Sequence, residues 1–245
     1  GTGCDRAAAR CERAGGSGGG GLWCCLCGLI DYGRRLTGWQ KGQVIRALAV
    51  ESEIRGTDAA GVAYNSGGRL HICKRPGPAH KLNLFIPEDA YVVMGHSRMT
   101  TQGKAKYNRN NHPFTGNVPG TRFALAHNGV LYNDRTLRRE KKLPKTNIET
   151  DSYVAVQLIE QQGALTPASL KTVAEAVEGD FVYTVLDEED GFWFVKGDNP
   201  LCLEQFPRLG LYVYASTREI LHMALEKTWL GREKPVQISV DGGEI

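Results

Sequence analysis

Five short segments of this sequence carry reactive or polar side chains that secondary structure alone does not require. They are residues 27–30, 55–61, 95–103, 126–130 and 149–151. A cysteine thiolate is a nucleophile, and a side-chain amide beside a glycine N–H can stabilise an oxyanion. Each segment alone has a plainer explanation, because cysteines at strand starts are commonly buried and Asn-Gly pairs commonly form tight turns. The five segments together are more specific than any one of them.

In this order and spacing, the five segments resemble the glutaminase domain of class II glutamine amidotransferases, the N-terminal-nucleophile type. The resemblance covers about residues 27–220. Residues 55–61, Arg-Gly-Thr-Asp-Ala-Ala-Gly, are most similar to glucosamine-6-phosphate synthase and glutamine phosphoribosylpyrophosphate amidotransferase. The resemblance implies an α+β protein with a four-layer αββα fold, in which two mostly antiparallel sheets pack between helical layers.

By this resemblance, Cys27 is the nucleophile and its own α-amino group is the base. A thiol with a reference pKa of about 8.5 needs a base, and a free α-amine with a pKa of about 7.7–8.0 can take its proton. An amide nitrogen cannot, because its lone pair is delocalised into the carbonyl. Cys27 must therefore begin the mature chain, either after cleavage of a propeptide or after initiation at Leu26 and removal of that residue.

The resemblance also assigns the oxyanion hole and the two charges that bind substrate. Asn128 supplies a side-chain amide and Gly129 a backbone N–H to the oxyanion. Arg98 binds the α-carboxylate of glutamine, which suits its bidentate guanidinium, and Asp151 accepts the α-ammonium. Asp151 could otherwise simply cap a helix that begins there.

The loop after Arg98 departs from the family pattern. Met99 and Thr101 are expected to contact glutamine on a loop that helps close over it. Glucosamine-6-phosphate synthases usually have tryptophan after the arginine and histidine three residues later, where this chain has Met99 and Gln102. The residues expected to brace the site are Arg55, Asp58 and His96.

Length, charge and composition exclude several classes of protein. With 245 residues and 41% hydrophobic content, the chain can bury one substantial core, so a single catalytic domain is expected. The net charge is +3, and the one basic cluster, residues 138–145, has no interleaved aromatic residues, so nucleic-acid binding is not expected. No apolar stretch could span a membrane and residues 1–30 lack a secretory signal, which predicts a cytoplasmic protein.

The start of the chain differs from the rest. Residues 1–26 are dominated by Gly, Ala, Arg and Cys, and we expect a disordered or removable leader, followed by the glutaminase domain at residues 27–245. Five of the seven cysteines fall in residues 1–27, which does not suit a disulfide framework. The adjacent pair Cys24 and Cys25 does not follow the spacing of a zinc site, so no metal is expected.

Periodicity and turn residues predict the elements that would position these side chains. The expected helices lie around residues 44–54, after residue 150, from a Thr166 cap towards Gly179, and at 220–225. The expected strands are residues 27–32, 61–64, 69–74, 91–95, 123–126, 181–186, 192–196 and 211–214. Two pairs of these strands form hairpins, which favours antiparallel sheets with helices outside.

The expected reaction is hydrolysis of the side-chain amide of L-glutamine through a cysteinyl thioester, without metal or organic cofactor. The ammonia would pass to an unidentified acceptor, held by a separate synthase subunit unless this chain is a fragment or a stand-alone glutaminase. Two alternatives stay open. One is another N-terminal-nucleophile amidohydrolase, an acylase or protease; the other is a catalytically silent binding member that retains its leader.

Overall fold

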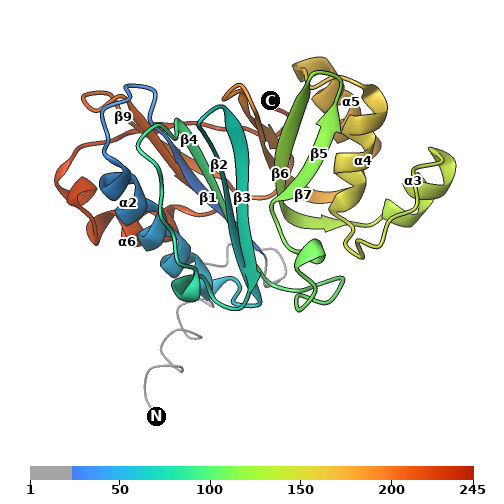
Figure 1. Ribbon diagram of the computed structural model, residues 1–245, viewed down its shortest axis with the longest axis horizontal. Coiled ribbons are helices and arrows are strands. Elements are labelled where there is room, and N and C mark those ends of the chain that lie inside the picture. The colour runs from blue at the N-terminus through green and yellow to red at the C-terminus, as the bar shows by residue number, and fades with distance from the viewer. Residues whose placement is uncertain (1–23) are drawn as a thin grey trace, which may run out of the picture.

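The computed structural model describes residues 24–245, in which two β-sheets pack face to face and helices cover their outer faces (Figure 1). The seven-stranded sheet has the order β11-β9-β10-β1-β4-β2-β3, and the four-stranded sheet has the order β5-β6-β7-β8. Neighbouring strands pair antiparallel throughout both sheets. The four layers agree with the expected αββα arrangement. Residues 1–23 of the expected leader lie outside the described residues.

Each sheet has its own helical layer. The seven-stranded sheet consists of β1 (Cys25–Ile30), β2 (Ala59–Ser66), β3 (Arg69–Pro76), β4 (Val92–Arg98), β9 (Cys202–Phe206), β10 (Leu211–Ala215) and β11 (Val236–Ile238), covered by α2 (Gly38–Glu51) and α6 (Arg218–Glu226). The four-stranded sheet consists of β5 (Phe114–Val118), β6 (Thr121–Leu131), β7 (Gly179–Asp187) and β8 (Phe192–Lys196), with α3 (Asp134–Glu140), α4 (Tyr153–Gln162) and α5 (Pro167–Ala176). No helix in residues 24–245 combines the length and apolar character needed to cross a bilayer.

Side chains of β1 alternate between two separate cores. Cys25, Cys27 and Leu29 belong to the core between the seven-stranded sheet and its helices. Leu26 belongs to the core between the two sheets, and Ile30 packs against it. This alternation follows from the two-residue period of a strand, and it determines which side chains of β1 can face the other sheet.

Most of the expected elements are present, with differences at their ends. The hairpin of β2 and β3 turns at Gly67 and Gly68, whose φ angles are 57° and 71°. Thr166 caps α5 through a hydrogen bond from Ser169 N, but the helix ends at Ala176 because Gly179 already starts β7. The first strand begins at residue 25 rather than 27, so the boundary expected at residues 26 and 27 falls inside a buried strand.

Three histidines are buried near β4 and β6: His96 faces the other sheet, whereas His127 shares the helix-covered face of β6 with Leu125. The ring centroids of His96 and His112 are 4.1 Å apart, and those of His112 and Phe114 are 4.4 Å apart. His96 Nε2 lies 3.0 Å from the His127 carbonyl oxygen, and His127 Nδ1 lies 2.7 Å from Ser152 Oγ. Burial lowers the pKa of all three histidines, that of His96 to about 3. They are therefore neutral in the folded protein near pH 7.

We expect the protein to lose stability as the pH falls below about 6.5, the pKa of an exposed histidine. The unfolded chain then binds protons that the folded chain rejects, so the free energy of unfolding decreases by up to about 1.4 kcal/mol per pH unit for each histidine. Urea unfolding between about pH 7.5 and 5.5 measures this slope. His112→Phe should reduce the slope by the contribution of one histidine. An unchanged slope in His112→Phe would contradict the assignment.

Candidate active site

The structure places Cys27 in the core beneath α2, away from the other sheet. Its side chain is 1% exposed and packs in the same cluster as Val44 and Leu48 of that helix. Burial raises the pKa of the thiol far above its usual range, the neighbouring Cys25 adds to the increase, and a hydrogen bond from the Ser52 side chain opposes it. The expectation that this sulfur attacks a substrate between the sheets does not fit its position.

Cys24 is the cysteine that contacts the loop after Arg98. It directly precedes β1 and is partly buried, and its thiol donates a hydrogen bond to the Met99 carbonyl oxygen at 3.4 Å. Burial raises the pKa of the Cys24 thiol to about 11, the Met99 carbonyl and the Arg98 charge lower it, and the Asp151 charge raises it. The two charged residues expected to bind glutamine thus act on Cys24. Cys24 lies two residues before Leu26, and residues two apart on a strand share a face. This spacing was the signal in the sequence that could have identified Cys24.

Arg98 ends β4 as a buried cation. The residue is 3% exposed, and its guanidinium donates hydrogen bonds to Asn111 Oδ1 at 2.6 Å and to the carbonyl oxygens of Gln102 and Gly103 at 2.5 and 3.3 Å. All three acceptors are neutral. Within the described part of the chain, no carboxylate forms an ion pair with Arg98. The Asp58 and Asp151 charges attract the guanidinium from beyond ion-pair distance, so an anionic ligand group could still form the direct ion pair here.

Asp151 is the matching buried anion. It is 3% exposed, and its Oδ2 accepts a hydrogen bond from the Leu131 backbone N at 2.7 Å. This bond ties the aspartate to the end of β6, two residues beyond Gly129. Among residues 24–245, no Lys, Arg or His side chain forms an ion pair with Asp151. A buried cation and a buried anion, each without an ionic partner, therefore lie near one thiol.

The Asn128–Gly129 pair sits near the end of β6. Asn128 is fully buried, and its Nδ2 donates to Ser216 Oγ, 3.3 Å away across the space between the sheets. Ser216 Oγ in turn accepts a hydrogen bond from Leu26 N at 2.8 Å, which links Asn128 to β1. Gly129 has a φ of 145°, and a Cβ there would lie 1.8 Å from the Asp180 carbonyl oxygen. Only glycine fits this position, and it leaves the backbone accessible.

The expected supporting residues differ in what they contact. The Asp58 carboxylate accepts a hydrogen bond from Thr100 N at 2.8 Å, so it holds the loop that follows Arg98. His96 is buried between the sheets, as described above. Arg55 follows the short helical turn η2 (Ser52–Ile54). Thr101 lies exposed on the loop, while Met99 contributes its carbonyl oxygen to Cys24.

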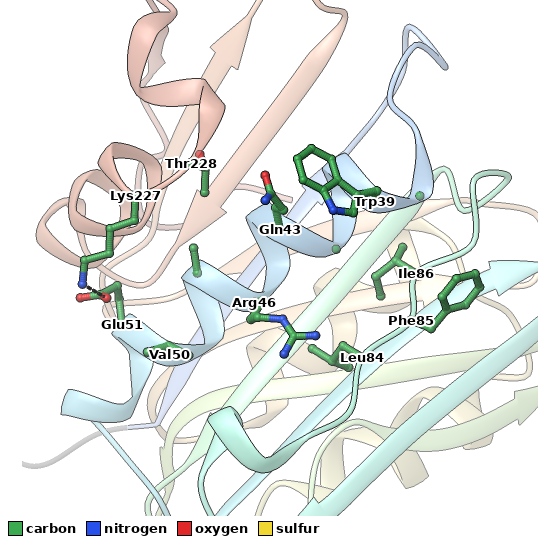
Figure 2. A pocket seen from close by; sticks show the side chains of 13 residues that line it. Trp39, Gln43, Arg46, Val50, Glu51, Leu84, Phe85, Ile86, Lys227 and Thr228 are labelled. Atoms are coloured by element: carbon green, nitrogen blue, oxygen red, sulfur yellow. Dashed lines mark hydrogen bonds and ion pairs between the residues drawn. The ribbon is translucent and has the colours of Figure 1, made fainter.

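A groove of about 580 Å³ lies elsewhere, on the outer face of α2 (Figure 2). Trp39, Arg46 and Val50 line it from the helix, and Phe85 lines it from the opposite segment. Trp39 and Phe85 are 68% and 82% exposed. None of the residues near Cys24 lines this groove, so it is separate from the candidate active site.

Comparison with known proteins supports the sequence resemblance. Residues 96–223 match the family model of the glutamine amidotransferase domain. The chain is 31% identical over 186 residues to glutamine–fructose-6-phosphate aminotransferase (isomerizing) of Bacillus thuringiensis, a match that covers 72% of this chain and 30% of that protein. The protein of the same name from Listeria innocua is 30% identical over 186 residues, again covering 30% of its length. The chain thus spans under a third of these relatives.

Solved structures agree in fold. Glutamine phosphoribosylpyrophosphate amidotransferase from B. subtilis superimposes with a TM-score of 0.64 at 20% identity, over 82% of this chain and 43% of that one. A structure described as the allosteric regulatory enzyme of purine biosynthesis gives a TM-score of 0.65, also at 20% identity. Since the family model matches more than half of the chain and the two-sheet fold agrees with these enzymes, this chain belongs to the class II glutamine amidotransferase family.

Proposed function

We propose that this chain hydrolyses the side-chain amide of L-glutamine through a thioester on Cys24. The observation that carries the proposal is the pair of buried, unpaired charges, Arg98 and Asp151, which both act on the Cys24 thiol. Free glutamine presents an α-carboxylate and an α-ammonium on one carbon, so one ligand would satisfy both charges. Its amide would then extend towards the sulfur and Asn128.

The α-amino group of Cys24 would act as the base. A thiol whose pKa is raised to about 11 is protonated near pH 7, so it needs an adjacent proton acceptor. A free α-amine has a pKa of about 7.7–8.0 and would take the thiol proton as sulfur attacks the amide carbon. The resulting ammonium would give a proton to the leaving nitrogen, which departs as ammonia. Water, deprotonated by the same amine, would then cleave the thioester to glutamate.

The two oxyanion donors would be Asn128 Nδ2 and the Gly129 backbone N–H. During both steps, negative charge develops on the former amide oxygen. Neutral donors already held in a buried site stabilise that charge without reorganisation, and loss of one commonly costs about 3–4 kcal/mol of barrier. The full burial of Asn128 and the steric requirement for glycine at residue 129 support this role.

The ammonia acceptor would lie outside this domain. The relatives that carry the name glutamine–fructose-6-phosphate aminotransferase are more than three times as long as the matched region. We propose that a separate synthase subunit, or a further part of the same protein, receives the ammonia. An acylase or protease of the same fold would not need the Arg98 and Asp151 pair, so comparing glutamine with acyl amides separates these functions.

Separate serine substitutions of Cys24 and Cys27 test which residue is the nucleophile. Cys24→Ser should reduce glutamine hydrolysis by more than about 1,000-fold, because a hydroxyl is a far poorer nucleophile under this base. Cys27→Ser removes a buried thiol of the same strand and should leave kcat within a few-fold while lowering stability. Ammonia release and intact mass of the trapped γ-glutamyl enzyme are the measurements. Full activity in Cys24→Ser, with loss in Cys27→Ser, would return the role to Cys27.

Removal of the Asp151 charge tests recognition of the α-ammonium. Asp151→Asn should raise KM for glutamine by about 10- to 1,000-fold, as expected for loss of a buried charge pair. The same variant should lose its preference for glutamine over Nα-acetylglutamine, which has no ammonium. Steady-state kinetics with both substrates measure the change. If the preference is retained, Asp151 does not bind the ammonium.

The mature terminus provides an independent test. The proposed base requires that active protein begin at Cys24, so intact mass and N-terminal sequencing should find residues 1–23 absent. Protein that keeps these residues should hydrolyse glutamine at most at trace rates, and it should gain activity once a protease exposes Cys24. A fully active protein with residues 1–23 attached would exclude an α-amine base. Purified protein that keeps these residues and stays inactive after exposure of Cys24 would instead fit the silent-member alternative.

A further inference from the structure

We propose that Asn199 is a positioning residue that orients the Gly129 N–H for the oxyanion, an inference that rests on the proposed function. Asn199 lies between β8 and β9, seventy-one residues from Asn128, and is 7% exposed. Its Nδ2 donates a hydrogen bond to the Asn128 carbonyl oxygen at 2.8 Å. Its side-chain nitrogen also lies 2.8 Å from the position that a Gly129 Cβ would take, so the amide packs directly on this glycine.

The planar peptide group transmits this contact. The carbonyl of Asn128 and the N–H of Gly129 belong to one peptide unit, and the peptide here is trans. In a trans peptide, the C=O and N–H bonds point in opposite directions within a rigid plane. A donor that fixes the direction of the Asn128 carbonyl therefore also fixes the direction of the Gly129 N–H.

The strand register leaves that N–H unused by the sheet. Gly129 stands opposite Phe181 on β7, but the Phe181 carbonyl accepts from Gly197 N at 3.0 Å, on the β8 side. Asp187 N, six residues further along β7, likewise bonds on the β8 side, to the Gly191 carbonyl. Because N–H and C=O of one strand residue point the same way, the Gly129–Phe181 pair is a non-hydrogen-bonded pair. The Gly129 N–H consequently points away from β7.

The opposite edge of β6 is open at this position. β5 pairs with β6 only as far as Leu125, which stands opposite Phe114. Beyond it, the His127 carbonyl points to the same edge as the Gly129 N–H and is met by His96 Nε2 at 3.0 Å from the other sheet. The ladder therefore does not fix the Gly129 N–H on its outer side. On the inner side the Asn128 carbonyl faces β7, where Asn128 stands opposite Val182, and Asn199 adds a side-chain donor to that carbonyl.

The role predicts a selective kinetic defect. Asn199→Ala should lower kcat by about 10- to 100-fold, as for other residues that orient a catalytic group. KM for glutamine should change by less than about three-fold, because Arg98 and Asp151 still bind the α-groups. Asn199→Asp keeps the shape and removes the donor, so it should show the same defect if the alanine variant fails to fold.

Asn65 offers a matched control. It is 6% exposed, and its Nδ2 also donates to a backbone carbonyl of another element, that of Asp187 at 2.7 Å. Asn65→Ala should lower the melting temperature by an amount similar to that of Asn199→Ala, but it should leave kcat unchanged. A purely structural role for Asn199 predicts the same behaviour for both variants.

A transition-state mimic distinguishes positioning from general damage. The γ-aldehyde analogue of glutamine adds the Cys24 thiol and places a tetrahedral oxygen in the oxyanion hole, whereas glutamate does not. In Asn199→Ala, affinity for the aldehyde should fall by the same factor as kcat/KM while affinity for glutamate stays within about two-fold. Unchanged kcat, or equal losses for both ligands, would overturn the role of Asn199. A wild-type protein without glutaminase activity would instead overturn the proposed function, and this role with it.

Discussion

The pleat of β1 is the constraint on which the rest of the site depends. This strand runs inside the seven-stranded sheet, paired with β4 on one side and β10 on the other, so its register cannot shift. A shift of one residue would exchange the faces of all its side chains. Leu26 is held in the core between the sheets, and this forces Cys25 and Cys27 towards the helices. Cys24, directly before the strand, is the cysteine of this segment whose thiol is affected by the Arg98 and Asp151 charges.

Arg98 and Asp151 are two buried charges of opposite sign. The Arg98 guanidinium donates hydrogen bonds to neutral acceptors and is attracted by the Asp58 and Asp151 charges without forming an ion pair, and Asp151 receives one backbone N–H from β6. A buried charge without an ionic partner destabilises the fold unless polar groups or a ligand compensate it. A zwitterionic amino acid would compensate both at once, whereas a plain amide would leave both charges unsatisfied. This difference explains how one small site could select free glutamine over other amides.

Local chemistry explains which parts of the fold could be predicted from the sequence. The Gly67-Gly68 turn and the Thr166 cap depend on neighbouring residues only, and both were predicted correctly. The start of β1 depends on the pairing of Cys25 with Ser97, which no local signal reveals. The same distant pairing decides the face of each cysteine. The motifs therefore indicated the family correctly, whereas the cysteine that they favour as nucleophile faces α2 in the structure.

The reactive residues and the residues that hold them come from different parts of the chain. Cys24, Arg98, Asn128 and Asp151 all precede residue 152, and each belongs to a recognisable segment or strand end. Their supports, Ser216 and Asn199, follow much later and bond to Asn128 across 88 and 71 residues. Neither support carries a reactive group, so no motif search would select it. Because Asn128 is held by side chains that flank β9 and β10, the geometry of the proposed oxyanion hole depends on the later strands of the chain as well as on the motif-bearing half.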